Sequence, residues 1–168
     1  MDQTQFNIDE IFEIAEQIER NGARFYRAAA DTVGDREQVL MLTDLAAMED
    51  EHERTFAAMR KELAEGLRRE SVYEPDDLAA QYLWAWASKA VFDMDADPFA
   101  VLTGGADLDE ILKVAIGREK ESIVYYEGLK AGVGPDDKTK VDAIIQEEML
   151  HVAILMKALN RLHGVKAG

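Results

Sequence analysis

The chain has 168 residues, of which 48% are hydrophobic and 32% charged, and it contains no cysteine. These values are typical of one globular domain. The missing cysteine excludes disulfides, iron–sulfur clusters and thiolate metal sites, so a metal would need ligands from His, Asp, Glu or Tyr. The formal net charge of −15 makes nucleic acids and anionic membranes poor partners, and we expect neither.

No run of about 18 apolar residues occurs, as a membrane-spanning helix would require. The first residues, Met1 to Gln5, lack the basic start and the apolar run of a signal peptide. We therefore expect a cytoplasmic protein whose residues 1–168 form a single domain.

Two long helices are predicted in residues 7–66. Asn7 and Glu10 resemble a capping box at the start of the first helix, and Asp35 with Gln38 resembles a cap for the second. Residues 31–35 break the pattern between them, and the second helix should fray near residues 66–70. Each helix has a stripe, spaced by threes and fours, that should be buried. The stripes are Ile8, Ile11, Ala15, Glu19, Gly22, Tyr26 and Ala29, then Leu42, Leu45, Glu49, His52, Phe56, Met59 and Leu63.

A long crossover is predicted at about residues 67–106. Pro75 suits a first helical position, so a shorter helix should run from Asp76 to Val91 and carry Trp84 and Trp86. These tryptophans are interpreted as core or dimer contacts. Residues 93–105 have the Gly and Pro content of a loop.

A second pair of long helices is predicted in residues 107–164. Asp107 and Glu110 resemble a capping box, the segment 132–135 forms a turn, and the last helix runs from about Asp136 to His163 before Gly164. Their stripes are Leu108, Ile111, Ala115, Glu119, Ser122, Tyr126 and Leu129, then Val141, Ile144, Glu148, His151, Leu155, Ala158 and Leu162. Because no stretch alternates with period two, the predicted fold class is all-α.

The two pairs of helices are related by an internal repeat. An offset of 100 residues superposes Glu19 and Tyr26 on Glu119 and Tyr126. An offset of 99 superposes Glu49 and His52 on Glu148 and His151, together with their apolar neighbours. The carboxylates lie at similar distances from the turn of each antiparallel hairpin, since a helix rises about 1.5 Å per residue. Four carboxylates and two imidazoles should therefore meet at mid-height of a four-helix bundle.

Such a buried set of charges needs a partner, because burying unpaired carboxylates is costly. Oxygen and imidazole ligands without sulfur suit iron or manganese, although zinc is a possible occupant. Two divalent ions would neutralise the four carboxylates. Glu16, Glu53, Glu121 and Glu147 adjoin these positions, but we interpret them as solvated charges that point elsewhere.

One glutamate from each of two helices, with Glu-x-x-His from each of the other two, is the ligand pattern of ferritin-like di-iron proteins. With Glu19, Glu119, Glu49-x-x-His52 and Glu148-x-x-His151, the chain resembles the ferritin-like superfamily, specifically rubrerythrin-family and bacterioferritin-type domains. The resemblance implies a four-helix bundle of two antiparallel hairpins joined by a long crossover. It also implies two iron ions and a homodimer or higher homo-oligomer.

The resemblance also implies roles for individual residues. Glu49 and Glu148 would bridge both ions, and each ion would be completed by one further pair, Glu19 with His52 and Glu119 with His151. Tyr26 and Tyr126 would bond carboxylates or ordered water, or would be core aromatics with a bonded hydroxyl.

The chain departs from rubrerythrins in two ways. Ser122 stands where they commonly have a further glutamate, which questions the redox-linked change of ligand associated with it. Because the sequence contains no cysteine, we also expect no rubredoxin-like domain in it, so a peroxidase would need a separate electron donor.

The leading hypothesis is a di-iron oxidoreductase that reduces hydrogen peroxide or oxygen as Fe(II) is oxidised. The alternative is a ferroxidase for iron storage or delivery. A metal-free helical interaction protein is the third interpretation, suggested by the tryptophans of the crossover.

Overall fold

The computed structural model describes residues 8–65, 102 and 105–164. In these residues it has four long helices and no strand, which confirms the all-α prediction: α1 Ile8–Thr32, α2 Arg36–Ala64, α5 Leu108–Gly132 and α6 Pro135–Leu162. The predicted shorter helix with Trp84 and Trp86, and the predicted cap at Asn7, lie outside the described residues. Within the described part of the chain, no helix is long and apolar enough to cross a membrane.

The helix ends follow their local sequences. The Asp35 carboxylate accepts hydrogen bonds from the backbone N–H groups of the first turn of α2. Asp107 and Glu110 form the predicted capping box of α5, with the Asp107 carboxylate accepting from Glu110 N at 3.0 Å. Pro135 starts α6, and Gly164 follows its end with φ of +67°, a conformation that favours glycine.

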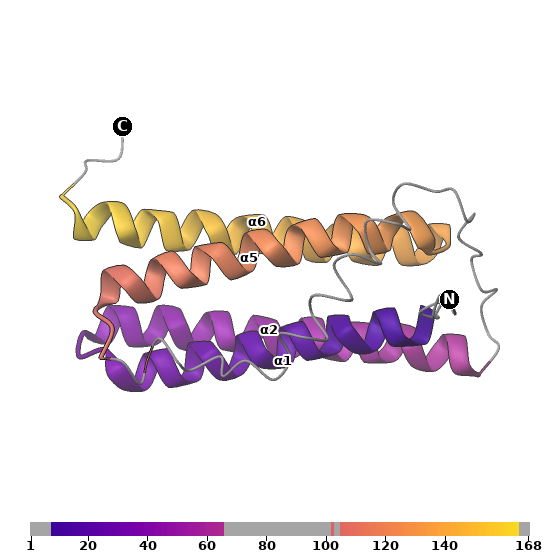
Figure 1. Ribbon diagram of the computed structural model, residues 1–168, viewed down its shortest axis with the longest axis horizontal. Helices are drawn as coiled ribbons and strands as arrows, with labels where there is room; N and C mark the ends of the chain where they lie inside the picture. Colours follow the sequence, from indigo (N-terminus) through magenta and orange to yellow (C-terminus); the bar gives the residue numbers. More distant parts are fainter. Residues whose placement is uncertain (1–7, 66–101, 103–104, 165–168) are drawn as a thin grey trace, which may run out of the picture.

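Short connections make two antiparallel hairpins, α1–α2 and α5–α6. One hairpin lies over the other (Figure 1), and α1 packs against α5 while α2 packs against α6. The last residues of α2 and the first residues of α5 lie at opposite ends of the bundle, as a long crossover requires (Figure 1). The predicted four-helix bundle is therefore confirmed.

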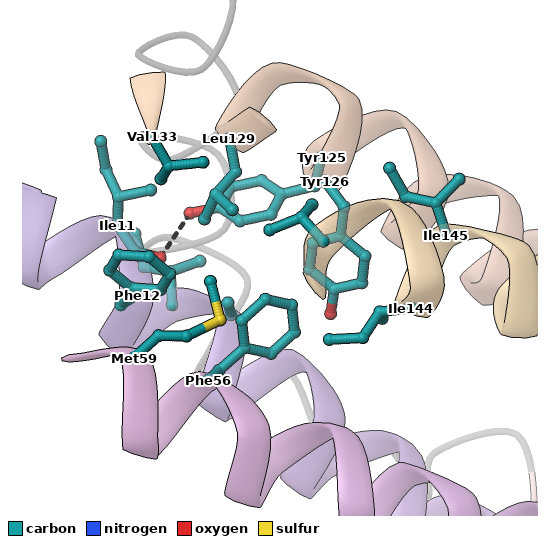
Figure 2. Close-up of a cluster of buried hydrophobic side chains, with 13 residues drawn as sticks. Ile11, Phe12, Phe56, Met59, Tyr125, Tyr126, Leu129, Val133, Ile144 and Ile145 are labelled. Atoms are coloured by element: carbon teal, nitrogen blue, oxygen red, sulfur yellow. Dashed lines mark hydrogen bonds between the residues drawn. The ribbon is translucent and has the colours of Figure 1, made fainter. Parts of the chain in front are cut away.

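The core has two apolar clusters, one on each side of a layer of polar side chains. Both clusters take residues from all four helices. Figure 2 shows the first, the Phe56 cluster, which consists of Ile11, Phe12, Ile14, Ala15, Phe56, Met59, Tyr125, Tyr126, Leu129, Val133, Val141, Ile144 and Ile145. The second, the Leu42 cluster, consists of Phe25, Tyr26, Ala29, Leu42, Leu45, Ala46, Ile111, Leu112, Ala115, Ile116, Leu155 and Leu159.

The buried faces are wider than the predicted stripes. Phe12, Phe25 and Tyr125 are fully buried although they lie outside them, because each helix packs against two neighbours. The Tyr125 hydroxyl donates to the carbonyl oxygen of Ile11 at 2.9 Å, the dashed line in Figure 2. The prediction that Leu162 is buried is wrong, since it is 47% exposed at the last residue of α6.

Candidate metal centre

The structure brings all six predicted ligand residues together in the layer between the two apolar clusters. Each of these six residues is at most 4% exposed. Their ligand atoms form two overlapping groups, and within each group the atoms lie within 4.8 Å of one another. The first group is Glu19, Glu49, His52 and Glu148, and the second is Glu49, Glu119, Glu148 and His151. Glu49 and Glu148 belong to both groups.

The layer results from helical spacing in each hairpin. Residues three apart share a face of a helix, so α2 and α6 each direct a glutamate and a histidine into the bundle. Helices α1 and α5 add one glutamate each, from positions related by the repeat. The internal symmetry of the chain thus becomes an approximate symmetry of the site.

The donor atoms lie at distances suited to a shared metal ion. His52 Nδ1 is 2.9 Å from Glu148 Oε1 and 3.5 Å from Glu19 Oε2. His151 Nδ1 is 3.2 Å from Glu49 Oε1, 3.1 Å from Glu148 Oε2 and 3.6 Å from Glu119 Oε1. Two ligands that bind one ion at about 2.1 Å and at right angles lie about 3.0 Å apart. Both histidines therefore present Nδ1 to the carboxylates at suitable distances.

Two tyrosines connect the hairpins through the terminal glutamates. The Tyr26 hydroxyl of α1 donates to Glu119 Oε1 of α5, and the Tyr126 hydroxyl of α5 donates to Glu19 Oε1 of α1. Burial, together with the nearby carboxylates, raises the pKa of both tyrosines well above 10, so both hydroxyls keep their protons. Each tyrosine thus bonds the glutamate of the opposite hairpin.

Without a metal, protons balance part of the negative charge. Burial raises the pKa of Glu148 to about 7 and raises that of Glu49 well above 4.5. Burial lowers the pKa of His52, but the hydrogen bonds and charges of Glu148 and Glu19 outweigh it and raise that pKa to about 11. The same competition, with Glu119 and Glu148 as the main partners, raises the pKa of His151 to about 12.

Unpartnered buried atoms test whether the site fits a metal. Glu19 Oε2, Glu49 Oε1, His52 Nδ1 and Glu148 Oε1 are buried and lie close to one another, but none of them makes a hydrogen bond with well-aligned geometry among the described residues. Leaving such atoms unpaired is costly, whereas a cation that binds several of them at once removes the penalty. All four belong to the first ligand group, and two of them belong to residues shared with the second. The residues therefore fit a pair of divalent ions.

Two residues near the site make contacts that the sequence patterns missed. Glu147 was interpreted as a solvated charge that points elsewhere, but its carboxylate lies 2.8 Å from His52 Nε2. The Glu147 side chain is half exposed, as expected, but the interpretation that it points elsewhere is wrong, because it is rotated from Glu148 by one helical step and reaches across to α2. Gly22 lies beside Glu49, and a Cβ atom there would be 3.1 Å from Glu49 Oε2. In the sequence, only the position of Gly22 within a predicted buried stripe indicated this contact.

The substitution Gly22→Ala should have opposite effects on folding and on metal binding. Alanine is favoured over glycine in a helix interior by about 1 kcal/mol, and the Glu49 side chain can move away from the new Cβ, so the melting temperature of the metal-free protein should rise by about 2–4 °C. The new Cβ would displace the Glu49 carboxylate, so we expect the affinity for Co(II) to fall by at least about tenfold. Thermal melts and calorimetric Co(II) titrations measure the two effects.

Gly117 provides a matched control. It lies within α5, and a Cβ atom there would meet nothing within 4 Å. Gly117→Ala should therefore bring the helical gain with unchanged Co(II) affinity. Equal Co(II) affinities for the two variants would contradict the role assigned to Gly22.

Comparisons with known proteins agree with this geometry. The family model for rubrerythrin matches residues 1–60. A solved structure of a Thermotoga maritima protein, described as ferritin-like and diiron-carboxylate, is 26% identical, with a TM-score of 0.66. The match covers 95% of this chain and 98% of the Thermotoga chain. No curated protein matches the chain.

Proposed function

We propose that this chain, whose residues 1–60 match the rubrerythrin family model and whose fold resembles that of a ferritin-like diiron-carboxylate protein, is a di-iron oxidoreductase that reduces hydrogen peroxide or oxygen as Fe(II) is oxidised. The observation that carries the proposal is the pair of overlapping ligand groups that share Glu49 and Glu148. Two sites with shared carboxylates suit a two-metal centre better than two separate ions.

Each ligand has a proposed role. Glu49 and Glu148 would hold both ions, Glu19 and His52 would complete one site, and Glu119 and His151 would complete the other. Four carboxylates balance the charge of two divalent ions, which supports a pair. When bound, two Fe(II) ions supply two electrons at one place, as the reduction of peroxide to water requires.

The protein controls the surroundings of this centre. The apolar clusters on both sides exclude bulk water and favour a small oxidant over a large organic substrate. Tyr126 holds Glu19 by Oε1, which leaves Glu19 Oε2 directed at the site. Tyr26 holds Glu119 by Oε1, the same oxygen that lies 3.6 Å from His151 Nδ1. The tyrosines thus orient the terminal carboxylates and keep hydroxyl protons beside them.

Anaerobic loading with Fe(II) tests the proposal. We expect about two iron ions per chain, loss of one peroxide per iron pair after addition of hydrogen peroxide, and recovery of the Fe(II) form with a chemical reductant. His163→Gln, which alters the exposed histidine at the end of α6, should behave like the unmodified protein. Failure to bind iron, or iron that reacts with neither peroxide nor oxygen, would refute the proposal.

Ferroxidation for storage or delivery is the second candidate. The net charge of −15 favours it because an acidic surface attracts Fe(II). A ferroxidase would oxidise many Fe(II) ions per chain in excess iron, whereas the proposed oxidoreductase retains its pair. The homodimer or higher homo-oligomer stays a prediction, which light scattering would test. A small oligomer without an iron core would argue against storage.

A further inference from the structure

The two histidines of the candidate metal centre differ at the ring nitrogen that faces away from the carboxylates. His52 Nε2 lies 2.8 Å from the carboxylate of Glu147. His151 Nε2 is buried, and it has no hydrogen-bond partner among the described residues. The two halves of the site therefore differ in the hydrogen-bond partner of the histidine Nε2, although their ligand residues repeat.

A position at which the internal repeat is broken explains this difference. Glu147 precedes the shared ligand Glu148 on α6 and reaches His52 on α2. The offset of 99 that relates Glu148 to Glu49 relates Glu147 to Met48. A methionine sulfur is only a weak hydrogen-bond acceptor. The second hairpin thus supplies a carboxylate for the histidine of the first, but the first hairpin has no such carboxylate at the equivalent position.

We infer that Glu147 is a positioning residue that makes the two metal sites unequal, so that the Glu19–His52 half binds its ion more tightly than the Glu119–His151 half. The inference rests on the metal centre of the proposed function. When His52 donates its Nε2–H to Glu147, the lone pair resides on Nδ1. Nδ1 is the atom that faces Glu148 and Glu19 at 2.9 and 3.5 Å.

Among the described residues, nothing gives the His151 half the same support. Its Nδ1 also faces carboxylates, at 3.1–3.6 Å, but no acceptor among the described residues holds its Nε2. An imidazole that binds a metal through Nδ1 keeps its proton on Nε2, and a buried donor without an acceptor costs free energy. Partners of this kind change metal affinity by about 10–100-fold. We expect a difference of this size between the two halves.

Single-ion variants separate the effect of Glu147 from repulsion between the ions. His151→Ala leaves the half that contains His52, and His52→Ala leaves the half that contains His151. Calorimetric titration with Co(II) should show at least about tenfold tighter binding to the His151→Ala variant. Adding Glu147→Met should weaken binding to that variant by about 10–100-fold and leave the His52→Ala variant unchanged.

Glu51→Gln controls for the loss of one negative charge. The Glu51 side chain is 69% exposed on α2, where it pairs with Arg54. This variant should leave both affinities unchanged. The inference is overturned if Glu147→Met has no effect on the His151→Ala variant or weakens both single-ion variants equally. No Co(II) binding by the unmodified protein would refute the metal centre itself, whereas two bound ions with equal intrinsic affinities would refute only the inequality.

A second measurement leaves all ligands in place. In the Zn(II)-loaded protein, ¹H–¹⁵N spectra of the imidazole groups should show one Nε2–H proton, that of His52, shifted downfield by a hydrogen bond to a carboxylate. Glu147→Met should remove that downfield shift from His52 without moving the signals of His151. An unchanged Nε2–H shift of His52 would overturn the inference even if a ligand-deletion variant failed to fold.

Discussion

Replacing Glu148 by alanine is expected to abolish the binding of both metal ions, whereas replacing Glu119 should remove mainly one. Glu148 belongs to both ligand groups and Glu119 to one. Glu148 Oε1 lies 2.9 Å from His52 Nδ1 and Oε2 lies 3.1 Å from His151 Nδ1, so one carboxylate faces both halves of the site. Its loss therefore removes a donor from each half and leaves three carboxylates for the charge of two ions.

Metal analysis after anaerobic iron loading measures this effect. We expect about two ions per chain for the unmodified protein, near zero for Glu148→Ala and about one for Glu119→Ala. Glu148→Gln keeps the shape of the side chain and should also lose both ions, which separates lost coordination from a packing defect. Glu121→Ala, an exposed position on α5, is the control and should retain both. Retention of two ions by Glu148→Ala would contradict the bridging role.

The metal-free protein should lose stability as the pH rises from about 6 to 9, and the metal-loaded protein should not. The folded state raises the pKa of Glu148 from 4.5 to about 7 and that of His52 from 6.5 to about 11. A raised pKa means that the folded chain binds more protons than the unfolded chain between the two values. The stabilisation of His52 is complete below pH 6.5 and disappears as the pH approaches 11.

The expected slope follows from proton linkage. For each extra proton bound by the folded state, the free energy of unfolding falls by about 1.4 kcal/mol for every unit by which the pH rises. That corresponds to about 3–5 °C in melting temperature per pH unit for a chain of this size. A bound metal replaces these protons, because carboxylate and neutral imidazole are the coordinating forms. The loaded protein should therefore gain in relative stability as the pH rises.

Thermal melts of the metal-free and Mn(II)-loaded protein across this pH range test the prediction. The loaded sample is a matched control, since it has the same exposed His163 and the same chain termini. We expect the difference between the two melting temperatures to widen steadily with pH. Parallel curves for the two samples would show that the six residues do not exchange protons for metal.

Much of the fold and the candidate site could be predicted because the required information is local and repeated. The Asp107–Glu110 capping box and the break before Asp35 involve neighbours in the chain, so short sequence patterns located them. The spacing of Glu49 with His52 places both on one helical face in any packing. The internal repeat then showed the same pattern a second time, in the other hairpin. The prediction that Leu162 is buried failed because burial at the last residue of a helix depends on whether a neighbouring helix extends beside it.

The sequence by itself determined which side chains enter the polar layer, since helical periodicity selects the buried face. Only the tertiary structure decided which atoms meet across the helices. It paired Tyr26 with Glu119, directed Glu147 to His52 and set Gly22 against Glu49. These contacts join residues 27 to 95 positions apart in the chain. They depend on how each helix is rotated about its axis and how far it is shifted along its neighbours, and a pattern within one helix contains neither quantity.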